Sequence, residues 1–349
     1  MKNKIVLLFV LAFILQINSV FSQGCEDEAA TSTSANAEDK PVTMRMFGYI
    51  QPEYDYTFSD PAVSTFGFRR ARLGVTGKVL KDFSYYFMLE ASPFIGGVGS
   101  AYLMDAFVTY EKYNWARVSV GSFKQPFSLE VATPCFALTT IDRSIVADQL
   151  VAPQRDYGLM LLGGNKYTKF RYAVALMNGR GLNVKDNNTK KDIIGRVTYK
   201  LFDFLSVGGS FRYGYPNNDK DTRTTFGGEF LLNVKNFGIQ GEYIYDEGDY
   251  NRAAGGGCGS EPVELGEKRD GAYIMLTYDF PNNIQPVFKY EYFDPNIDVK
   301  KIGYQEMMTI GVNYFFNDYI RLQVNYQAHI ETDINIDNDK FLAQVQVKF

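Results

Sequence analysis

Apolar and polar residues alternate along much of the chain with a period of two. In residues 341–349, every second position from Phe341 to Phe349 is apolar, while Gln344, Gln346 and Lys348 fall between them. Successive side chains of a β-strand point to opposite faces, so this segment is expected to form a strand. Comparable segments of about ten residues recur along the chain, with tyrosine or phenylalanine near their ends. Such a series is typical of a transmembrane β-barrel, whose strands face lipid on one side and water on the other.

The alternation also assigns a face to each residue of a predicted strand. Within residues 66–79, Arg70 and Arg72 are expected to point into the barrel. In a later segment the same rule places Met104 on the lipid face and Asp105 inside. About sixteen segments of this kind can be counted, and the even number agrees with single-chain bacterial barrels.

The connections between these segments fall into two classes. Short ones, such as residues 81–82 and 317–318, alternate with longer ones, and the two classes never exchange places. Outer-membrane barrels have short periplasmic turns and long external loops, whereas a soluble β-sandwich gives no reason for this segregation. The sequence therefore predicts an all-β fold, a transmembrane antiparallel β-barrel over residues 44–349.

The third long connection, residues 126–156, contains apolar residues such as Phe127 and Leu150 that are unsuited to a loop lying in water. A barrel of about sixteen strands is wide enough for an aqueous channel. We therefore expect this loop to fold into the barrel and narrow it. The alternative is an external loop that packs on its neighbours or on another subunit.

The amino terminus has the features of an exported protein. Lys2 and Lys4 precede an apolar run that is too short to span a bilayer, so residues 1–22 are expected to be a signal peptide. The alternative, lipidation of Cys25, lacks the aliphatic and small residues expected before such a cysteine. Residues 23–43 are rich in Ala, Ser, Thr and acidic residues, and we expect a disordered periplasmic tether.

Composition excludes several classes of function. A net charge of −4 and a single histidine argue against nucleic-acid binding and against a histidine-based catalytic or zinc centre. The three cysteines lack metal-ligand spacing, and neither a metal nor another cofactor is expected. Cys135 and Cys258 could form a disulfide or remain as two thiols. An outer-membrane lipase would need a serine and histidine pair, so no enzymatic activity is expected.

Four segments resemble the phosphate-selective porin O and P family. They are residues 68–74 (FRRARLG), 121–130 (GSFKQPFSLE), 155–158 (RDYG) and 178–179 (NG). The resemblance implies a sixteen-stranded channel in the outer membrane of a Gram-negative bacterium, in contact with lipid and usually trimeric. It also implies a third loop folded inward and a basic path for anions. Phosphate selectivity within the family belongs to members with dense clusters of arginine and lysine.

Basic residues on the inward face or in the third loop are the candidate anion contacts. Channels select anions through rings or ladders of Arg and Lys, and the guanidinium group binds two phosphate oxygens at once. The candidate anion-binding and constriction residues are Arg70, Arg72, Arg117, Lys124, Arg143 and Arg155. Inward carboxylates nearly balance these charges, so the alternative is a set of wall salt bridges with no solute preference. The sequence therefore predicts a passive porin for small anions or polar solutes, or else an outer-membrane scaffold or binding barrel with a closed lumen.

Overall fold

A computed structural model describes residues 42–97, 99–250, 264–299, 303–330 and 338–349. The predicted signal peptide, the predicted tether up to residue 41, Cys25 and Cys258 lie outside these ranges. Within them, Val42 forms a β-bridge with Val79, and the Thr43 amide donates a hydrogen bond to the Lys78 carbonyl.

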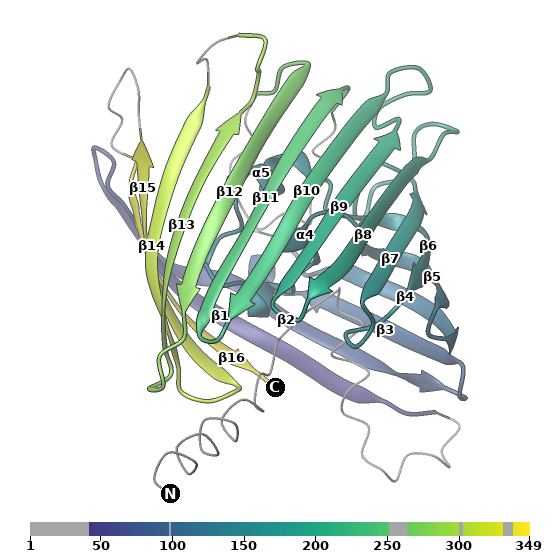
Figure 1. The fold of residues 1–349 in the computed structure, drawn as a ribbon, viewed down its shortest axis with the longest axis horizontal. Coiled ribbons are helices and arrows are strands. Elements are labelled where there is room, and N and C mark those ends of the chain that lie inside the picture. Colours follow the sequence, from purple (N-terminus) through teal and green to yellow (C-terminus); the bar gives the residue numbers. More distant parts are fainter. Residues whose placement is uncertain (1–41, 98, 251–263, 300–302, 331–337) are drawn as a thin grey trace, which may run out of the picture.

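Sixteen strands form one closed antiparallel barrel in the described part of the chain (Figure 1). Each strand pairs with its neighbours in sequence, and β1 pairs with β16 to close the wall. The predicted fold class is confirmed. The strands are β1 (Arg45–Thr57), β2 (Val63–Val79), β3 (Phe83–Glu90), β4 (Tyr102–Tyr113), β5 (Ala116–Lys124), β6 (Arg155–Gly163), β7 (Phe170–Met177), β8 (Asp192–Phe202), β9 (Leu205–Gly214), β10 (Arg223–Val234), β11 (Phe237–Gly248), β12 (Lys268–Tyr278), β13 (Ile284–Asp294), β14 (Gln305–Phe315), β15 (Ile320–Ile330) and β16 (Lys340–Lys348).

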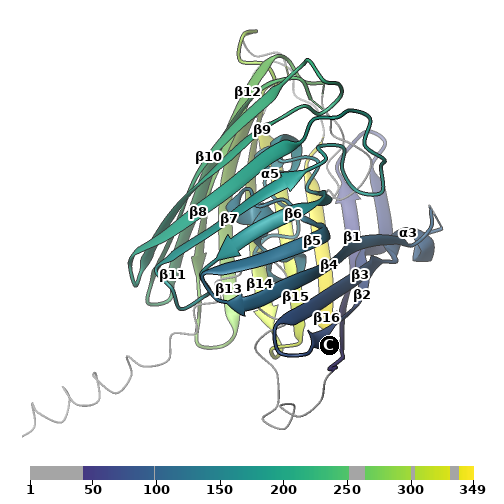
Figure 2. The ribbon, with the colours of Figure 1, turned by 90° about the vertical axis from the view of Figure 1, so that its right-hand side faces the viewer.

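Short and long connections lie at opposite ends of the barrel. Figure 2 shows the tilted wall, with tight turns such as those after β8 and β10 at one end. Apart from residues 58–62 after β1, the connections after odd-numbered strands, including residues 125–154 between β5 and β6, are longer than those after even-numbered strands. Barrel closure pairs the backbone groups of every strand on both sides, as a spanning structure in lipid requires.

The outer face of the wall is apolar and the inner face is polar. Outward aliphatic residues such as Val120 and Leu159 are exposed, whereas inward residues such as Gln51 and Thr109 are buried. Exposed aromatic side chains occur towards both ends of the strands, as expected at two membrane–water interfaces. They include Phe83, Trp115, Phe170, Phe202, Phe237, Phe280 and Phe316 towards the short turns, and Phe58, Phe66, Phe211, Phe226 and Tyr326 towards the long loops.

A β-bulge displaces the pattern of alternation at β2. Gln51 of β1 pairs with Arg70 and Pro52 pairs with Phe68, so Arg69 is an extra residue between them. Such a residue can turn its side chain away from the face that strict alternation assigns. Arg69 accordingly reaches Asp142 inside the barrel, next to the inward Arg70.

A second bulge, in β4, overturns one of the predictions from alternation. Met88 of β3 pairs with Asp105 and Leu89 pairs with Leu103, which leaves Met104 as the extra residue. The prediction that Met104 faces lipid is wrong: it is buried in the internal cluster with Met88 and Phe123. Two consecutive residues, Met104 and Asp105, are therefore both buried.

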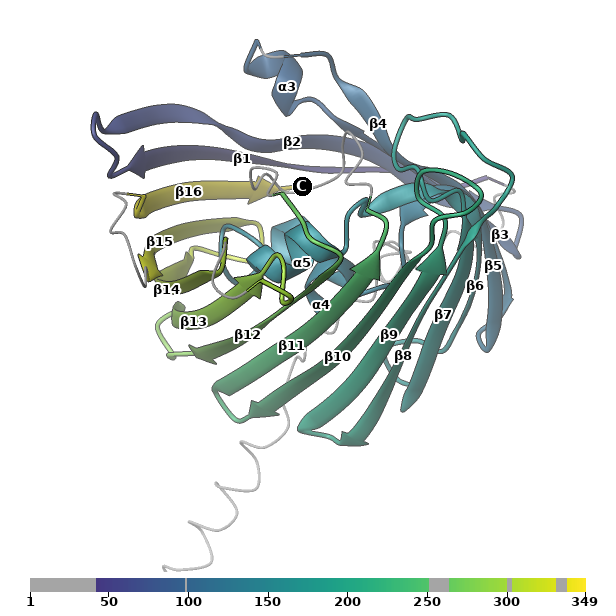
Figure 3. The same cartoon turned by 90° about the horizontal axis from the view of Figure 1, so that it is seen from above.

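The connection between β5 and β6 folds into the barrel, as predicted. We call residues 125–154 the third loop; Arg155 and Asp156, which the sequence places at its end, begin β6. Viewed from above in Figure 3, its helices α4 (Leu129–Ala132) and α5 (Ile145–Leu150) lie within the ring of strands. The loop also contains a 3₁₀ turn, η1 (Cys135–Ala137), while a further short helix, α3 (Ser92–Ile95), follows β3. Among the described residues, no helix is long and apolar enough to cross a membrane.

Candidate functional site

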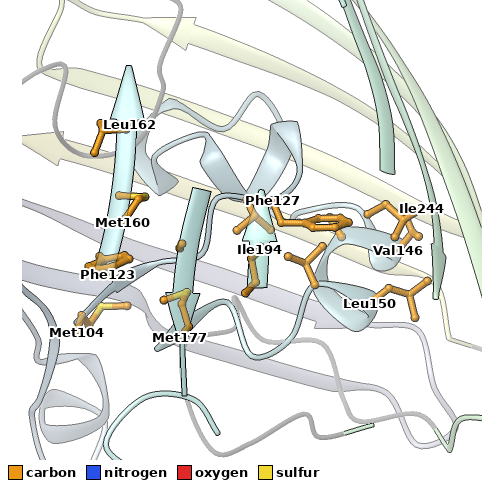
Figure 4. Packing of buried hydrophobic residues seen from close by; sticks show 14 of the residues in the cluster. Met104, Phe123, Phe127, Val146, Leu150, Met160, Leu162, Met177, Ile194 and Ile244 are labelled. Carbon is orange, nitrogen blue, oxygen red and sulfur yellow. The ribbon is translucent and has the colours of Figure 1, made fainter. Parts of the chain in front are cut away.

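Hydrophobic packing fixes one side of the third loop to the wall. Phe127, Val146 and Leu150 of the loop belong to one buried cluster with Ile194 of β8 and Ile244 of β11 (Figure 4). Gly227 of β10 leaves room for Phe127, because a Cβ at this glycine would lie only 3.2 Å from the phenyl ring. Burial of such side chains supplies a substantial part of the energy that holds the loop inside.

Carboxylates of the wall bind the amino-terminal ends of both loop helices. Glu242 of β11 accepts hydrogen bonds from the Leu129 amide (3.1 Å) and the Ser128 hydroxyl (2.9 Å) at the start of α4. Glu291 of β13 accepts a hydrogen bond of 2.6 Å from the Ile145 amide at the start of α5. The first amides of a helix have no partner within the helix and carry partial positive charge, so a carboxylate stabilises them.

Arginines of the wall bind backbone carbonyl groups in the middle and at the end of the third loop. Arg223 of β10 donates hydrogen bonds of 2.6 Å to the carbonyls of Leu150 and Ala152. Arg321 of β15 donates to the Leu138 carbonyl at 2.9 Å. These guanidinium groups face the lumen, where they hold protein backbone.

Amide side chains of β14 and β15 complete the attachment. Asn325 accepts a hydrogen bond of 2.8 Å from the Ile141 amide, and Asn313 donates to the Thr139 carbonyl at 2.9 Å. Contacts with the third loop thus come from β10, β11, β13, β14 and β15. The loop therefore crosses the lumen and reaches the wall opposite its own strands.

Four of the six predicted site residues meet at one part of the third loop, beside Cys135 and Thr133. We call this group the cationic cluster: Arg72 of β2, Lys124 of β5, Arg143 of the loop and Arg155 of β6. Lys124 donates to the Val131 carbonyl at 2.8 Å and to the Thr133 carbonyl at 3.2 Å. Arg143 donates to the Thr133 carbonyl at 3.0 Å and lies 3.5 Å from the Cys135 sulfur.

Two carboxylates neutralise part of the cationic cluster. Glu90 pairs with Arg72 at 2.6 Å, and Asp105 pairs with Arg155 at 2.9 Å, with all four side chains buried. The four cationic groups therefore exceed these two carboxylates by two charges. Arg72 also donates to the Tyr49 hydroxyl at 2.6 Å and to the Cys135 sulfur at 3.1 Å.

The two other predicted residues occupy different places. Arg117 donates to the Gly164 carbonyl at 2.8 Å, at the short turn between β6 and β7, well away from the third loop. Arg70 donates to Gln51 at 2.8 Å on the wall formed by β1 and β2.

Sequence reasoning missed Arg69, which forms an ion pair with Asp142 of the third loop. Burial raises the pKa of the Asp142 carboxyl, but Arg69 and Lys289 hold it below its ordinary value. Asp142 therefore carries a negative charge at neutral pH. The two consecutive arginines, 69 and 70, were the available signal, although alternation alone assigns them to opposite faces.

Metal binding finds no support in the described residues, since no group of three or more His, Cys, Asp or Glu side chains there is placed to hold an ion. The site instead consists of a cross-lumen loop, a net positive cluster on it and a wall of paired charges. This arrangement can narrow a passage and bias which ions occupy it.

Comparison with known proteins gives a family match over part of the chain. Residues 48–210 match the profile of the family described as phosphate-selective porin O and P. Porin O of Pseudomonas aeruginosa is 25% identical over 238 residues, which cover 64% of this chain and 53% of that protein. The chain therefore spans about half the length of this relative.

Solved structures with the same fold are outer-membrane barrels. An anion-selective porin from Comamonas acidovorans superposes with a TM-score of 0.66 at 12% identity, covering 88% of this chain and 100% of that one. OmpT of Vibrio cholerae, folded in vitro and in its trimer form, gives a TM-score of 0.59 at 14% identity, covering 89% and 100%. At these identities the likeness establishes the fold alone.

Proposed function

Because residues 48–210 match the phosphate-selective porin O and P family, we propose that the chain forms a water-filled channel for passive diffusion of small solutes. The family and the fold place it in the outer membrane of a Gram-negative bacterium. The observation that carries the proposal is the third loop, which lies inside a closed barrel with an apolar outside and a charged inside. The family match favours a channel over an enzyme.

The cationic cluster is the part of the lumen that supports a preference for anions, including phosphate. Its four basic groups face two carboxylates, and Arg143 and Lys124 both donate to the backbone carbonyl of Thr133. An anion near this point meets excess positive charge in surroundings that screen charge less than bulk water does. We therefore assign the anion preference to Arg72, Lys124, Arg143 and Arg155 first, with Arg70 as a neighbour and Arg117 outside the site.

Reconstitution of the purified barrel in a planar bilayer tests the proposal. We expect discrete open-channel currents. In a salt gradient, the reversal potential should have the sign that indicates higher permeability for anions than for cations. One unit charge about 5 Å from a passing ion in water contributes about 0.8 kcal/mol, favourable for an anion and unfavourable for a cation, so Arg143→Gln should lower the anion-to-cation permeability ratio by roughly tenfold.

Arg180→Gln is the matched control. Arg180 also binds a backbone carbonyl, that of Pro216, but it lies in the connection between β7 and β8. This variant should keep the wild-type ratio. A bilayer that stays sealed would instead support the scaffold or binding barrel with a closed lumen, and equal ratios in wild type and Arg143→Gln would remove the cluster from the selectivity argument.

We also propose that three copies associate through the outer face of β4 to β7. The outward residues in the middle of these strands are aliphatic, and α3 extends away from the wall beside this face (Figure 3). Phe94 and Ile95 of α3 are exposed, which suits contact with a second subunit. OmpT, a structure of the same fold, is described in a trimer form. The exposed aliphatic residues of this face are Val108, Val120, Leu159, Leu161, Val174 and Leu176.

Replacing Phe94 and Ile95 together by serine should lower the temperature at which trimers dissociate in detergent, because the contact loses its apolar side chains. Native mass spectrometry after stepwise warming measures this. Tyr319→Ser, at a short turn on the other end of the barrel, should leave the dissociation temperature unchanged. A wild-type protein that is monomeric in several mild detergents would contradict the trimer.

A further inference from the structure

Cys135 occupies an unusual position on the third loop. It is the one reduced cysteine among the described residues and begins the turn η1. Nη1 of Arg72 lies 3.1 Å from its sulfur, and Nη2 of Arg143 lies 3.5 Å away. Arg155 adds a third electrostatic interaction with the same thiol. Arginine next to a cysteine favours the thiolate, which is the nucleophilic form.

Within the ranges that the structure describes, two nitrogen atoms of the Arg143 guanidinium group lack hydrogen-bond acceptors beside Cys135. Its side chain is buried, with 3% of the residue exposed, yet Nε and Nη1 make no hydrogen bond within the described part of the chain. Buried guanidinium nitrogens normally find acceptors. The two nearby carboxylates, Glu90 and Asp105, are already engaged with Arg72 and Arg155. The site therefore offers donors for additional oxygen atoms on the sulfur.

We propose that Cys135 is an oxidation site that reacts with hydrogen peroxide and small hydroperoxides to give a sulfinate held by Arg143 and Arg72. Cys135 is only 2% exposed, so the reaction is restricted to small oxidants. This site is distinct from any disulfide, because oxygen atoms are added to a single sulfur.

The chemistry needs two peroxide molecules. The thiolate attacks one peroxide oxygen, an S–O bond forms as the O–O bond breaks, and hydroxide leaves and takes up a proton to become water. The sulfur is oxidised to sulfenic acid and the peroxide is reduced. A second peroxide oxidises the deprotonated sulfenate in the same way, giving the sulfinate and a second water. The guanidinium donors stabilise the anionic product.

Oxidation places a permanently anionic group at the cationic cluster. The inference about permeation rests on the proposed channel: a sulfinate fixes a negative charge and two acceptor oxygens beside Arg143 and Arg72. Anion preference is then expected to fall in oxidised channels. The chemical modification itself does not depend on whether the barrel conducts.

Mass spectrometry of peptides from the folded barrel tests the modification. Cys25 and Cys258 are first replaced by serine, and folding is checked by heat-modifiable migration on gels. Treatment with hydrogen peroxide should add two oxygens to Cys135. In Arg143→Gln the rate should fall severalfold, because the thiolate loses a neighbouring cation that stabilises it. Arg180→Gln should react at the wild-type rate.

The outcomes separate the inference from the proposed channel. Cys135 that stays unmodified at peroxide concentrations that oxidise the urea-unfolded chain overturns the inference, as do equal rates in wild type and Arg143→Gln. Oxidised Cys135 with an unchanged reversal potential supports the modification site but removes its link to permeation. In Cys135→Ser, peroxide should leave the reversal potential unchanged, whereas a shift of wild-type size there would assign the effect to other residues.

Discussion

Replacing Asp246 with alanine is expected to destabilise the barrel by about 3–5 kcal/mol. This carboxylate is fully buried and pairs with two arginines, Arg223 at 2.8 Å and Arg269 at 2.6 Å. Without it, both buried guanidinium groups lose their counter-charge, and the cost of leaving a charge uncompensated exceeds the value of the pair itself. Arg223 also holds the end of the third loop through Leu150 and Ala152, so the loop should loosen together with the wall.

Urea-dependent unfolding in detergent, followed by the fluorescence of the single tryptophan, Trp115, measures this change. Glu247→Ala is the matched control, because the neighbouring carboxylate lies on the opposite face of β11 and accepts a hydrogen bond from Tyr245. It should shift the unfolding midpoint little. A midpoint for Asp246→Ala within the error of wild type would show that the two arginines find other partners.

Gly227→Leu is expected to displace the third loop and raise single-channel conductance. A side chain here enters the space that Phe127 occupies, since the nearest ring atom would be 3.2 Å from the new Cβ alone. Overpacking of this kind typically costs about 1–3 kcal/mol, and the loop is the part that can move. The wall itself should tolerate the change, because no backbone atom is among the nearest contacts of this Cβ.

The adjacent glycine provides the comparison. A Cβ on Gly228 meets nothing within 4 Å, and its side chain would point to the outside of the barrel. Gly228→Leu should therefore conduct like wild type. The idea that Phe127 anchors the loop would be abandoned if both leucine variants showed the same conductance, or if Gly227→Leu conducted less than wild type.

The period-two pattern was sufficient to predict the barrel, its strand number and the inward third loop, because each depends on local alternation or on a long apolar connection. It could not predict the bulges at Arg69 and Met104. A bulge depends on the register between two strands, and one additional residue moves a side chain to the other face without altering the local composition. The failure at Met104 and the omission of Arg69 have this one cause.

The candidate site was predictable in its residue types but not in its partners. Alternation correctly placed Arg72 inside, yet it could not tell that this guanidinium contacts Cys135 or that Arg321 binds loop carbonyls. Such contacts join residues far apart in the sequence. Arg117 shows the same limit of alternation. It was predicted to face inward, but it lies at the short-turn end of the barrel, where it binds the Gly164 carbonyl and not the third loop.

The anchors of the third loop also bear on the order of assembly. Ser128 binds Glu242, 114 positions later in the chain, and Ile141 binds Asn325, 184 positions later. Neither partner exists beside the loop until the second half of the strands has been synthesised and paired. Docking is therefore a late event in biogenesis, and an incompletely closed intermediate holds the loop by few of its final contacts. A barrel that stalls at this stage of insertion would leave an unobstructed opening in the envelope.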